Sequence, residues 1–485
     1  MRILIRNAEL IACLDDADRR IGGDSASGAG SHSAFRLAGD KGERSPKGAL
    51  LVDGGRIEAI FEALPEGISA DQEIDAAGML ITPGLVNTHH HFYQTLTRNL
   101  PEGQDVPLFD WLAFHYEIWR ELDEEALATA TRTALAELLL SGCTLTSDHH
   151  YIFPAEAAPD LIDRQIEVAR ELGIRFQPTR GSMSLGRSQG GLPPDDLCQS
   201  EETILADCRR LIAAYHDHHP GAMVRIDLAP CSPFSVSEKA MRETAGLARE
   251  AGVRMHTHVA ETQDEEAYCR KEHGLRPVAY MKKLGWLGAD AWFAHAVHLS
   301  DAEIRLMGRT RTGVAHCPSS NMRLGSGIAR IRELLDAGAP VGLAVDGSAS
   351  NDCNHLLLEA RQALLASRLR KQEHWLGARD VLRIATRGGA QLMGRSECGS
   401  LAPGMAADLV LWDLNRLDMA GSLSDPLAGL VFAAAAPRAH TVLVGGEIRV
   451  RAGRIPGFDE ESQARRHRDQ AARLLERARR RKGNR

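Results

Sequence analysis

The sequence ITPGLVNTHHH at residues 81–91 joins a short apolar run to three consecutive histidines. In an extended strand, the side chains of residues i and i+2 point to the same side. His89 and His91 are therefore placed to share one metal ion, while His90 points away from it. Imidazole nitrogen is a common zinc ligand. A surface histidine cluster is the plainer interpretation, and an HxH pair alone does not exclude it.

Short apolar runs and helical patterns alternate from this stretch onward. Eight runs are candidate strands: 81–88, 143–147, 174–178, 224–229, 253–257, 291–294, 313–315 and 341–345. Helical patterns lie between them, at 124–141, 161–172, 237–251 and 328–337 among others. Repeated βα units in this number predict an α/β protein with a (β/α)8 barrel. A doubly wound open sheet is the alternative, but no GxGxxG follows the first strand, which disfavours it.

Both ends of the chain carry a different pattern, in which apolar and polar residues alternate. It occurs at 3–10, at 49–60 around the turn Asp53-Gly54-Gly55, and again at 408–412 and 440–450. Such alternation is typical of half-buried strands. We therefore expect a composite β-sandwich from 1–80 with 396–455, a hydrolase barrel at 81–395 and a basic tail at 456–485. Residues 15–47 are rich in Gly, Ser and charge, which predicts a long mobile loop.

Composition excludes several classes of protein. The 485 residues are 44% hydrophobic, which suits a large globular enzyme, and the net charge of -7 is modest and predicts no nucleic-acid partner. No apolar stretch of about 18 residues predicts a membrane span. The nine cysteines are scattered without a CxxC pair, and no signal sequence precedes them, so we expect reduced thiols and a cytoplasmic protein. The tail from 465 has ten basic and two acidic residues, and we interpret it as a solvated helix that frays, rather than a nucleic-acid-binding segment.

Polar residues that can bind a metal or move a proton follow several of the later strands. The fifth strand leads into His256-Thr257-His258-Val259-Ala260-Glu261, the sixth ends in His295, the seventh in His316-Cys317 and the eighth in Asp346. Active sites of such barrels gather at the carboxyl ends of the strands. One such histidine is usually a core residue, but several in register from the first strand to the eighth favour a metal site.

These residues resemble the amidohydrolase superfamily, in the branch of guanine, cytosine and S-adenosylhomocysteine deaminases and triazine hydrolases. The resemblance rests on PGLVNTHHH at 83–91, His258-x-x-Glu261, His295, Asp346-Gly347 and the late pattern GSLAPGMAADL at 399–409. It implies a metal held by His89, His91, His258 and Asp346. Binuclear relatives use a carboxylated lysine on the fourth strand, and residues 224–231 contain none, which favours one divalent metal per chain. Zinc suits this ligand set, and Fe²⁺ would also be accepted.

The resemblance also implies catalytic roles for three residues. Asp346 would accept the proton of the attacking water and pass it to the leaving amine. Glu261 would move a proton to the adjacent ring nitrogen, and His295 would orient the nucleophile. A surface carboxylate is the usual fate of a glutamate, but Glu261 lies three residues after a predicted ligand. His149, His150 and His316 would orient ligands through their other ring nitrogens.

A narrower resemblance points to the 8-oxoguanine deaminases. It rests on segments such as RGSMS at 180–184, APCSPF at 229–234 and DGSASN at 346–351. Isoxanthopterin deaminases and hydroxy-triazine aminohydrolases and chlorohydrolases share many of these residues and remain the alternatives. The resemblance implies a small heterocyclic substrate, converted to urate and ammonia if it is 8-oxoguanine, and we expect a homo-oligomer. The predicted substrate-binding residues are Gln94, Trp111, Tyr151, Arg180, Cys231 and Asn321.

Overall fold

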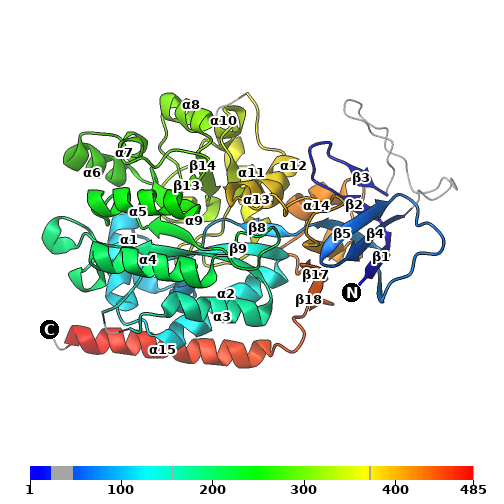
Figure 1. Cartoon of the computed structure of the whole chain (residues 1–485), viewed down its shortest axis with the longest axis horizontal. Helices are drawn as coiled ribbons and strands as arrows, with labels where there is room; N and C mark the ends of the chain where they lie inside the picture. Colours follow the sequence, from blue (N-terminus) through cyan, green and yellow to red (C-terminus); the bar gives the residue numbers. More distant parts are fainter. Residues whose placement is uncertain (23–46, 156, 371–372, 484–485) are drawn as a thin grey trace.

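The computed structural model describes residues 1–22, 47–155, 157–370 and 373–483. Figure 1 shows a barrel surrounded by helices, with a β domain at one side and a long C-terminal helix along another. The two ends of the chain contribute the outer parts: the N-terminal strands build the β domain, and the last helix, α15, runs beside the barrel. The β domain and α15 therefore both lie outside the repeated βα units that form the barrel.

Eight parallel strands form the barrel in sequential order, which confirms the predicted fold class. They are β8 (Leu85–Asn87), β9 (Cys143–His150), β10 (Arg175–Ser182), β11 (Asp227–Pro230), β12 (Met255–Val259), β13 (Ala291–His295), β14 (Gly313–His316) and β15 (Val341–Leu343). Hydrogen bonds between the last and first strands close it: Thr88 N and Oγ1 donate to Leu343 O at 3.1 and 3.0 Å. Asn87 Oδ1 accepts from Val345 N at 3.0 Å. Closure brings the ends of β8 and β15 together, where predicted ligands lie.

Helices cover the outside of the barrel, and their ends follow local sequence signals. Asp123 caps the longest of the early helices by accepting a hydrogen bond from Ala126 N, and Gly173 ends the next in the left-handed conformation. The helices around the barrel are α1 (Leu108–Trp119), α2 (Glu124–Leu140), α3 (Leu161–Leu172), α4 (Glu201–Tyr215), α5 (Glu238–Ala251), α6 (Gln263–His273), α7 (Pro277–Lys283), α8 (Asp301–Thr310), α9 (Pro318–Arg323), α10 (Ile331–Asp336), α11 (Leu356–Arg368), α12 (Ala378–Arg383), α13 (Gly389–Leu392) and α14 (Pro426–Phe432).

The run predicted as one strand at 81–88 is two strands, so that prediction is wrong in its bounds. β7 (Met79–Pro83) pairs with β2 and β16 in the β domain, and β8 begins the barrel. Gly84 lies between them. A Cβ there would meet Thr144 Oγ1 at 2.0 Å, so the residue between the two strands must lack a side chain. One continuous apolar run therefore serves both domains.

The β domain combines strands from both ends of the chain, as the alternating patterns predict. Its four-stranded sheet has the order β5-β4-β1-β6, and its six-stranded sheet the order β18-β17-β16-β7-β2-β3. Apolar side chains of the two sheets form one cluster, which includes Ile3, Leu50, Leu409 and Leu443. The strands are β1 (Ile3–Ala8), β2 (Leu10–Ala12), β3 (Arg20–Ile21), β4 (Gly48–Asp53), β5 (Arg56–Phe61), β6 (Gln72–Asp75), β7, β16 (Leu409–Asp413), β17 (Thr441–Val444) and β18 (Glu447–Arg451).

The structure tests two predictions about segments outside the barrel, the loop at 15–47 and the tail helix. Of the loop predicted at 15–47, Arg20–Ile21 forms β3 against β2, and residues 23–46 lie outside the described part of the chain. The tail forms the predicted helix and most of its side chains are exposed, but one face of it is docked on the barrel, which the prediction did not include. α15 (Glu460–Gly483) packs on α2 with Leu474 fully buried, and Gln463 donates to Thr129 O at 3.0 Å. Within the described residues, no helix is long and apolar enough to cross a membrane.

Candidate active site

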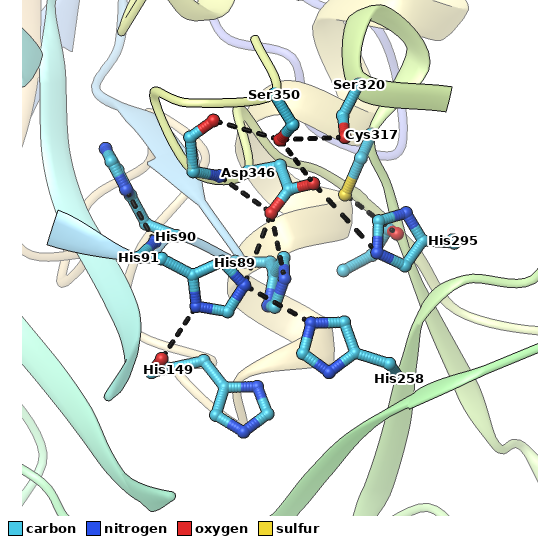
Figure 2. A network of polar contacts seen from close by, with 12 residues as sticks. His89, His90, His91, His149, His258, His295, Cys317, Ser320, Asp346 and Ser350 are labelled. Atoms are coloured by element: carbon cyan, nitrogen blue, oxygen red, sulfur yellow. Dashed lines mark hydrogen bonds and ion pairs between the residues drawn. The ribbon is translucent and has the colours of Figure 1, made fainter. Parts of the chain in front are cut away.

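Five side chains from four strand ends meet at the carboxyl end of the barrel, as Figure 2 shows. His89 and His91 follow β8, His258 is in β12, His295 ends β13, and Asp346 follows β15. His89 Nε2 and His91 Nε2 lie 3.3 and 3.4 Å from the same oxygen, Asp346 Oδ1. His91 Nε2 lies 3.2 Å from His258 Nε2. Two sets of these side chains lie close enough together to hold a metal ion. The first is His89, His91 and His258, and the second is His89, His295 and Asp346.

The hydrogen bonds of two histidines direct their second ring nitrogens toward this point. His91 Nδ1 lies 2.7 Å from His149 O, and His258 Nδ1 lies 2.6 Å from Cys231 O. A carbonyl oxygen only accepts, so each Nδ1 carries the proton and donates. Each Nε2 then presents its lone pair toward Asp346 and the other ligands. Metal-binding histidines are commonly oriented in this way.

His89 is oriented through a second histidine that the sequence analysis did not assign a role. His256 Nδ1 lies 3.0 Å from Trp292 O and must donate to it. His256 Nε2 is then an acceptor, and it lies 2.6 Å from His89 Nδ1, which donates to it. His89 Nε2 is left buried without a hydrogen bond, next to Asp346. Three imidazole lone pairs and one carboxylate therefore converge, and this donor set fits a divalent metal.

The hydrogen bond between His89 and His256 leads to a prediction about metal affinity. We expect His256→Phe to weaken zinc binding about 10- to 100-fold, because His89 Nδ1 loses the acceptor that fixes its tautomer. Zinc affinity measured by competition with a chelator tests this. His150→Phe is a matched control, since that ring is buried in β9 outside the groups of convergent ligands. Equal zinc affinities in wild type and His256→Phe would remove His256 from the metal site.

The ligand histidines are buried and neutral, as metal ligands must be. Burial lowers the pKa of His91, and it lowers the pKa of His89 and His258 well below the usual value. Burial acts in the opposite direction on Asp346, but the close contact with His89 and the neighbouring histidines outweighs it and lowers its pKa well below the usual value. The carboxylate is therefore ionised among neutral imidazoles, which is the charge state that favours a cation.

Strained backbone aims the side chains at the strand ends. His295, Asp346 and Ala260 have φ angles of 70°, 62° and 57°, in the left-handed region that residues with a Cβ rarely adopt. Each such residue costs of order 1–3 kcal/mol and tends to occur at functional sites. Gly347 N donates to Asp346 Oδ1 at 2.7 Å, and Ser350 Oγ donates to Oδ2 at 3.3 Å. These bonds hold the carboxylate at the turn.

Glu261 and His295 lie side by side next to the predicted metal ligands. His295 Nε2 lies 3.4 Å from Glu261 Oε2 and 4.0 Å from Asp346 Oδ2. Burial raises the pKa of Glu261 to about 7, so its carboxyl can gain and lose a proton near neutral pH. Burial alone would lower the pKa of His295, but the carboxylates of Glu261 and Asp346 raise it above its usual value. Asn321 Oδ1 lies 2.9 Å from His295 Nδ1 and orients this ring.

A cavity of about 390 Å³ opens onto these groups. α1 supplies one apolar wall through Leu108, Trp111 and Leu112, which lie on one face of the helix. The polar end contains Glu261, His295 and Asp346. Of the predicted substrate-binding residues, the cavity is lined by Gln94, Trp111, Tyr151 and Cys231.

Two predicted substrate-binding residues lie elsewhere. Asn321 contacts His295 instead of lining the cavity. Arg180 is on the outer face of β10, where its Nε donates to Asp207 of α4 at 2.6 Å and its guanidinium lies 3.8 Å from the Phe153 ring. The strand was predicted to end at 178 but continues to Ser182, and its alternation turns Arg180 outward. The prediction that Arg180 binds substrate is therefore not supported by its position.

The other histidines near the site contact different groups and are not among the predicted metal ligands. His90 points away from the ligands, accepting from His91 N through Nδ1 and packing on Phe92. His149 Nε2 donates to Ala229 O, and its own carbonyl accepts from His91. His149 therefore orients His91 through its backbone instead of its ring. His150 and His316 are buried near the site but are not in the groups of convergent ligands among the described residues.

Comparison with known proteins agrees with this geometry. The chain is 52% identical over 430 residues to an 8-oxoguanine deaminase of Pseudomonas aeruginosa, covering 88% of this chain and 95% of that one. It is 37% identical over 442 residues to an isoxanthopterin deaminase of an unknown prokaryotic organism, covering 87% and 91%. The structure of atrazine chlorohydrolase TrzN from Arthrobacter aurescens TC1, complexed with zinc, superposes with a TM-score of 0.88 at 34% identity, covering 97% of this chain and 100% of that one. The model of the Amidohydrolase family matches residues 80–449. The chain belongs to the amidohydrolase family.

Proposed function

We propose that the protein hydrolyses 8-oxoguanine to urate and ammonia. We propose that it uses one divalent metal ion per chain for this reaction. His89, His91, His258 and Asp346 would hold that metal, and zinc fits the three nitrogen and one oxygen donors. One observation carries the proposal. The cavity ends where the lone pairs of the histidines, the Asp346 carboxylate and the Glu261 carboxyl meet. The 52% identity to an 8-oxoguanine deaminase supports the choice of substrate.

A divalent metal held by these residues would activate water as a Lewis acid, so that a nucleophile would be available at neutral pH. Asp346 takes a proton from the attacking water and delivers it to the departing amine, which leaves as ammonia. Glu261 protonates the ring nitrogen next to the attacked carbon, which prepares the ring for addition, and is reprotonated by the hydroxyl group of the adduct when that group becomes the carbonyl. His295, oriented by Asn321, donates a hydrogen bond to the attacking oxygen. The water adds one oxygen to the ring, and the amino group departs.

The cavity walls suit a flat, polar ring. Trp111 and Tyr151 offer aromatic faces, and Trp111 is fixed by the hydrogen bond of its Nε1 to Ala349 O at 3.3 Å. Gln94 Oε1 accepts from Ala349 N at 3.3 Å, so its Nε2 is the donor that it can offer to a ring carbonyl. A pterin or a hydroxy-triazine presents similar edges, and the 37% identity to an isoxanthopterin deaminase keeps the pterin as the second candidate.

An ammonia-release screen tests the proposal. The panel contains 8-oxoguanine, isoxanthopterin, guanine, cytosine and hydroxy-triazines, and the metal content of the same sample is measured. We expect 8-oxoguanine to give the highest kcat/KM and the sample to hold about one zinc per chain. Turnover of only a pterin or a triazine would overturn the substrate assignment. Full activity that requires two metals per chain would overturn the single-metal site.

We further propose that the protein is a cytoplasmic homo-oligomer. All nine cysteines are free, which suits a reducing compartment. Large apolar side chains are exposed at Leu369 and Trp375, near the end of α11, and at Leu417. Light scattering on the purified protein gives the molar mass, and a value near 52.8 kDa would exclude the oligomer.

A further inference from the structure

α15 is the last helix of the chain. It lies beyond the region 80–449 that matches the family. Even so, it passes beside η1 (Phe92–Thr97), α1 and α2, along one side of the barrel (Figure 1). η1 and α1 both contribute side chains to the cavity, namely Gln94 from η1 and Leu108, Trp111 and Leu112 from α1. The C-terminal helix therefore supports two walls of the substrate cavity from outside.

The contact with η1 is a directed hydrogen bond. His467 Nε2 donates to Thr95 O at 2.9 Å, and His467 Nδ1 lies 2.9 Å from Thr133 Oγ1 of α2 and accepts from it. Burial lowers the pKa of His467, which is consistent with this neutral tautomer. Thr95 is the residue after Gln94 within a single short helix. Because the Thr95 peptide is held, the direction of the Gln94 side chain is held with it.

The contacts near α1 lie farther along α15. Arg477 donates to Glu121 O from Nε and Nη2 at 3.1 and 2.9 Å, just after the end of α1. Arg481 donates to Glu121 Oε1 at 2.8 Å and to Asp196 Oδ2 at 2.7 Å. Asp196 also pairs with Arg120. The basic face of α15 is thus bound to acidic groups and a carbonyl behind the α1 wall.

We propose that α15 is part of the substrate-binding apparatus, and that His467 is a positioning residue which fixes the η1 segment bearing Gln94. This inference rests on the proposed function only for the identity of the substrate. It requires that the cavity bind a ring, and not that the ring be 8-oxoguanine. His467 itself does not touch substrate; it acts through the Thr95 carbonyl on the neighbouring residue.

If α15 only stabilised the fold, variants of its buried polar residues would all have the same effect. Gln463 is a matched control that separates this role from the positioning of η1. Gln463 lies one turn before His467 on the same helix and is buried. Its Nε2 donates to Thr129 O at 3.0 Å and to Thr133 Oγ1 at 2.9 Å, both on α2. Loss of Gln463 weakens the docking of α15 on α2 but leaves the bond to η1. If α15 served stability alone, Gln463 and His467 variants would behave alike.

The experiment compares His467→Leu, His467→Gln and Gln463→Leu in the full-length, metal-loaded protein. KM and kcat are measured with whichever heterocycle releases ammonia fastest. We expect His467→Leu to raise KM about three- to tenfold, the factor that one hydrogen bond is worth, with little change in kcat or zinc content. His467→Gln keeps a donor near the position of Nε2 and should restore KM. Gln463→Leu should lower the melting temperature and leave KM unchanged.

A second measurement does not depend on activity. Hydrogen–deuterium exchange of residues 92–97 should be faster in His467→Leu than in Gln463→Leu. Only His467→Leu loses the hydrogen bond to Thr95 O that holds η1. The inference is overturned if KM and this exchange are unchanged in His467→Leu, or if both variants alter them equally. If no heterocycle in the panel is hydrolysed, the proposed function fails, while the exchange result still decides the role of His467.

Discussion

Glu261→Gln should lower kcat by about 10² to 10⁴ while the protein keeps its metal, the range typical of a lost general acid–base group. Glu261 lies 3.4 Å from His295 Nε2 and lines the cavity, but it is not in the groups of convergent metal ligands among the described residues. Glutamine has nearly the same shape, so Ser326 Oγ retains an acceptor at this position. The substitution removes the titrating proton and leaves the cavity filled.

The measurement pairs single-turnover ammonia release with elemental analysis of the same sample. Glu303→Gln is a suitable control, because Glu303 is also a buried glutamate but caps α8 and binds Arg276 far from the ligands. We expect that control to lose stability and retain kcat. A metal-loaded Glu261→Gln enzyme with near wild-type turnover would remove Glu261 from the mechanism. Loss of zinc from it would instead place Glu261 among the groups that support the metal.

The sequence predicts the barrel and the converging side chains because both follow simple periodic rules. His89 and His91 stand two residues apart after an apolar run, and His295 and Asp346 each end or follow another such run. Parallel strands align their carboxyl ends, so residues far apart in the chain are brought to one place. The role of His256 could not be predicted in this way. It depends on a 2.6 Å contact across the barrel between β12 and the second residue after β8.

Two other errors have physical causes in particular residues. Arg180 was expected to bind substrate because of the resemblance carried by residues 180–184 and because a guanidinium can pair with a ring carbonyl. Arg180 lies within β10, which runs on to Ser182, and its side chain is on the face of the strand that points outward to Asp207. The basic composition of the tail suggested a solvated helix. Its arginines instead find acidic partners on the barrel surface, as Arg477 does with Asp123, and its few apolar residues pack on α2. Composition alone does not reveal such complementary charges.

The cavity should also discriminate strongly between purines. We expect kcat/KM for 8-oxoguanine to exceed that for guanine by about 10⁴, because a site that pairs buried polar groups with a substrate rejects an analogue that leaves them unpaired. Compared with guanine, 8-oxoguanine adds a carbonyl oxygen and an N–H on the five-membered ring. The polar side chains of the cavity wall, including Gln94, Tyr151, Ser232 and Ser350, are available to pair with such groups.

Two variants locate this discrimination. Gln94→Leu should reduce the ratio of kcat/KM for the two purines by about tenfold or more, since it removes the amide donor without enlarging the cavity. Arg180→Ala should leave the ratio unchanged, even though it breaks the pair with Asp207 and lowers the melting temperature, because Arg180 lies on the outer face of β10. The ratio is the right measure, since a general loss of stability or metal affects both purines equally. A ratio that collapses in Arg180→Ala but persists in Gln94→Leu would mean that the five-membered ring is recognised from the β10 side of the barrel, and the present assignment of the cavity wall would be wrong.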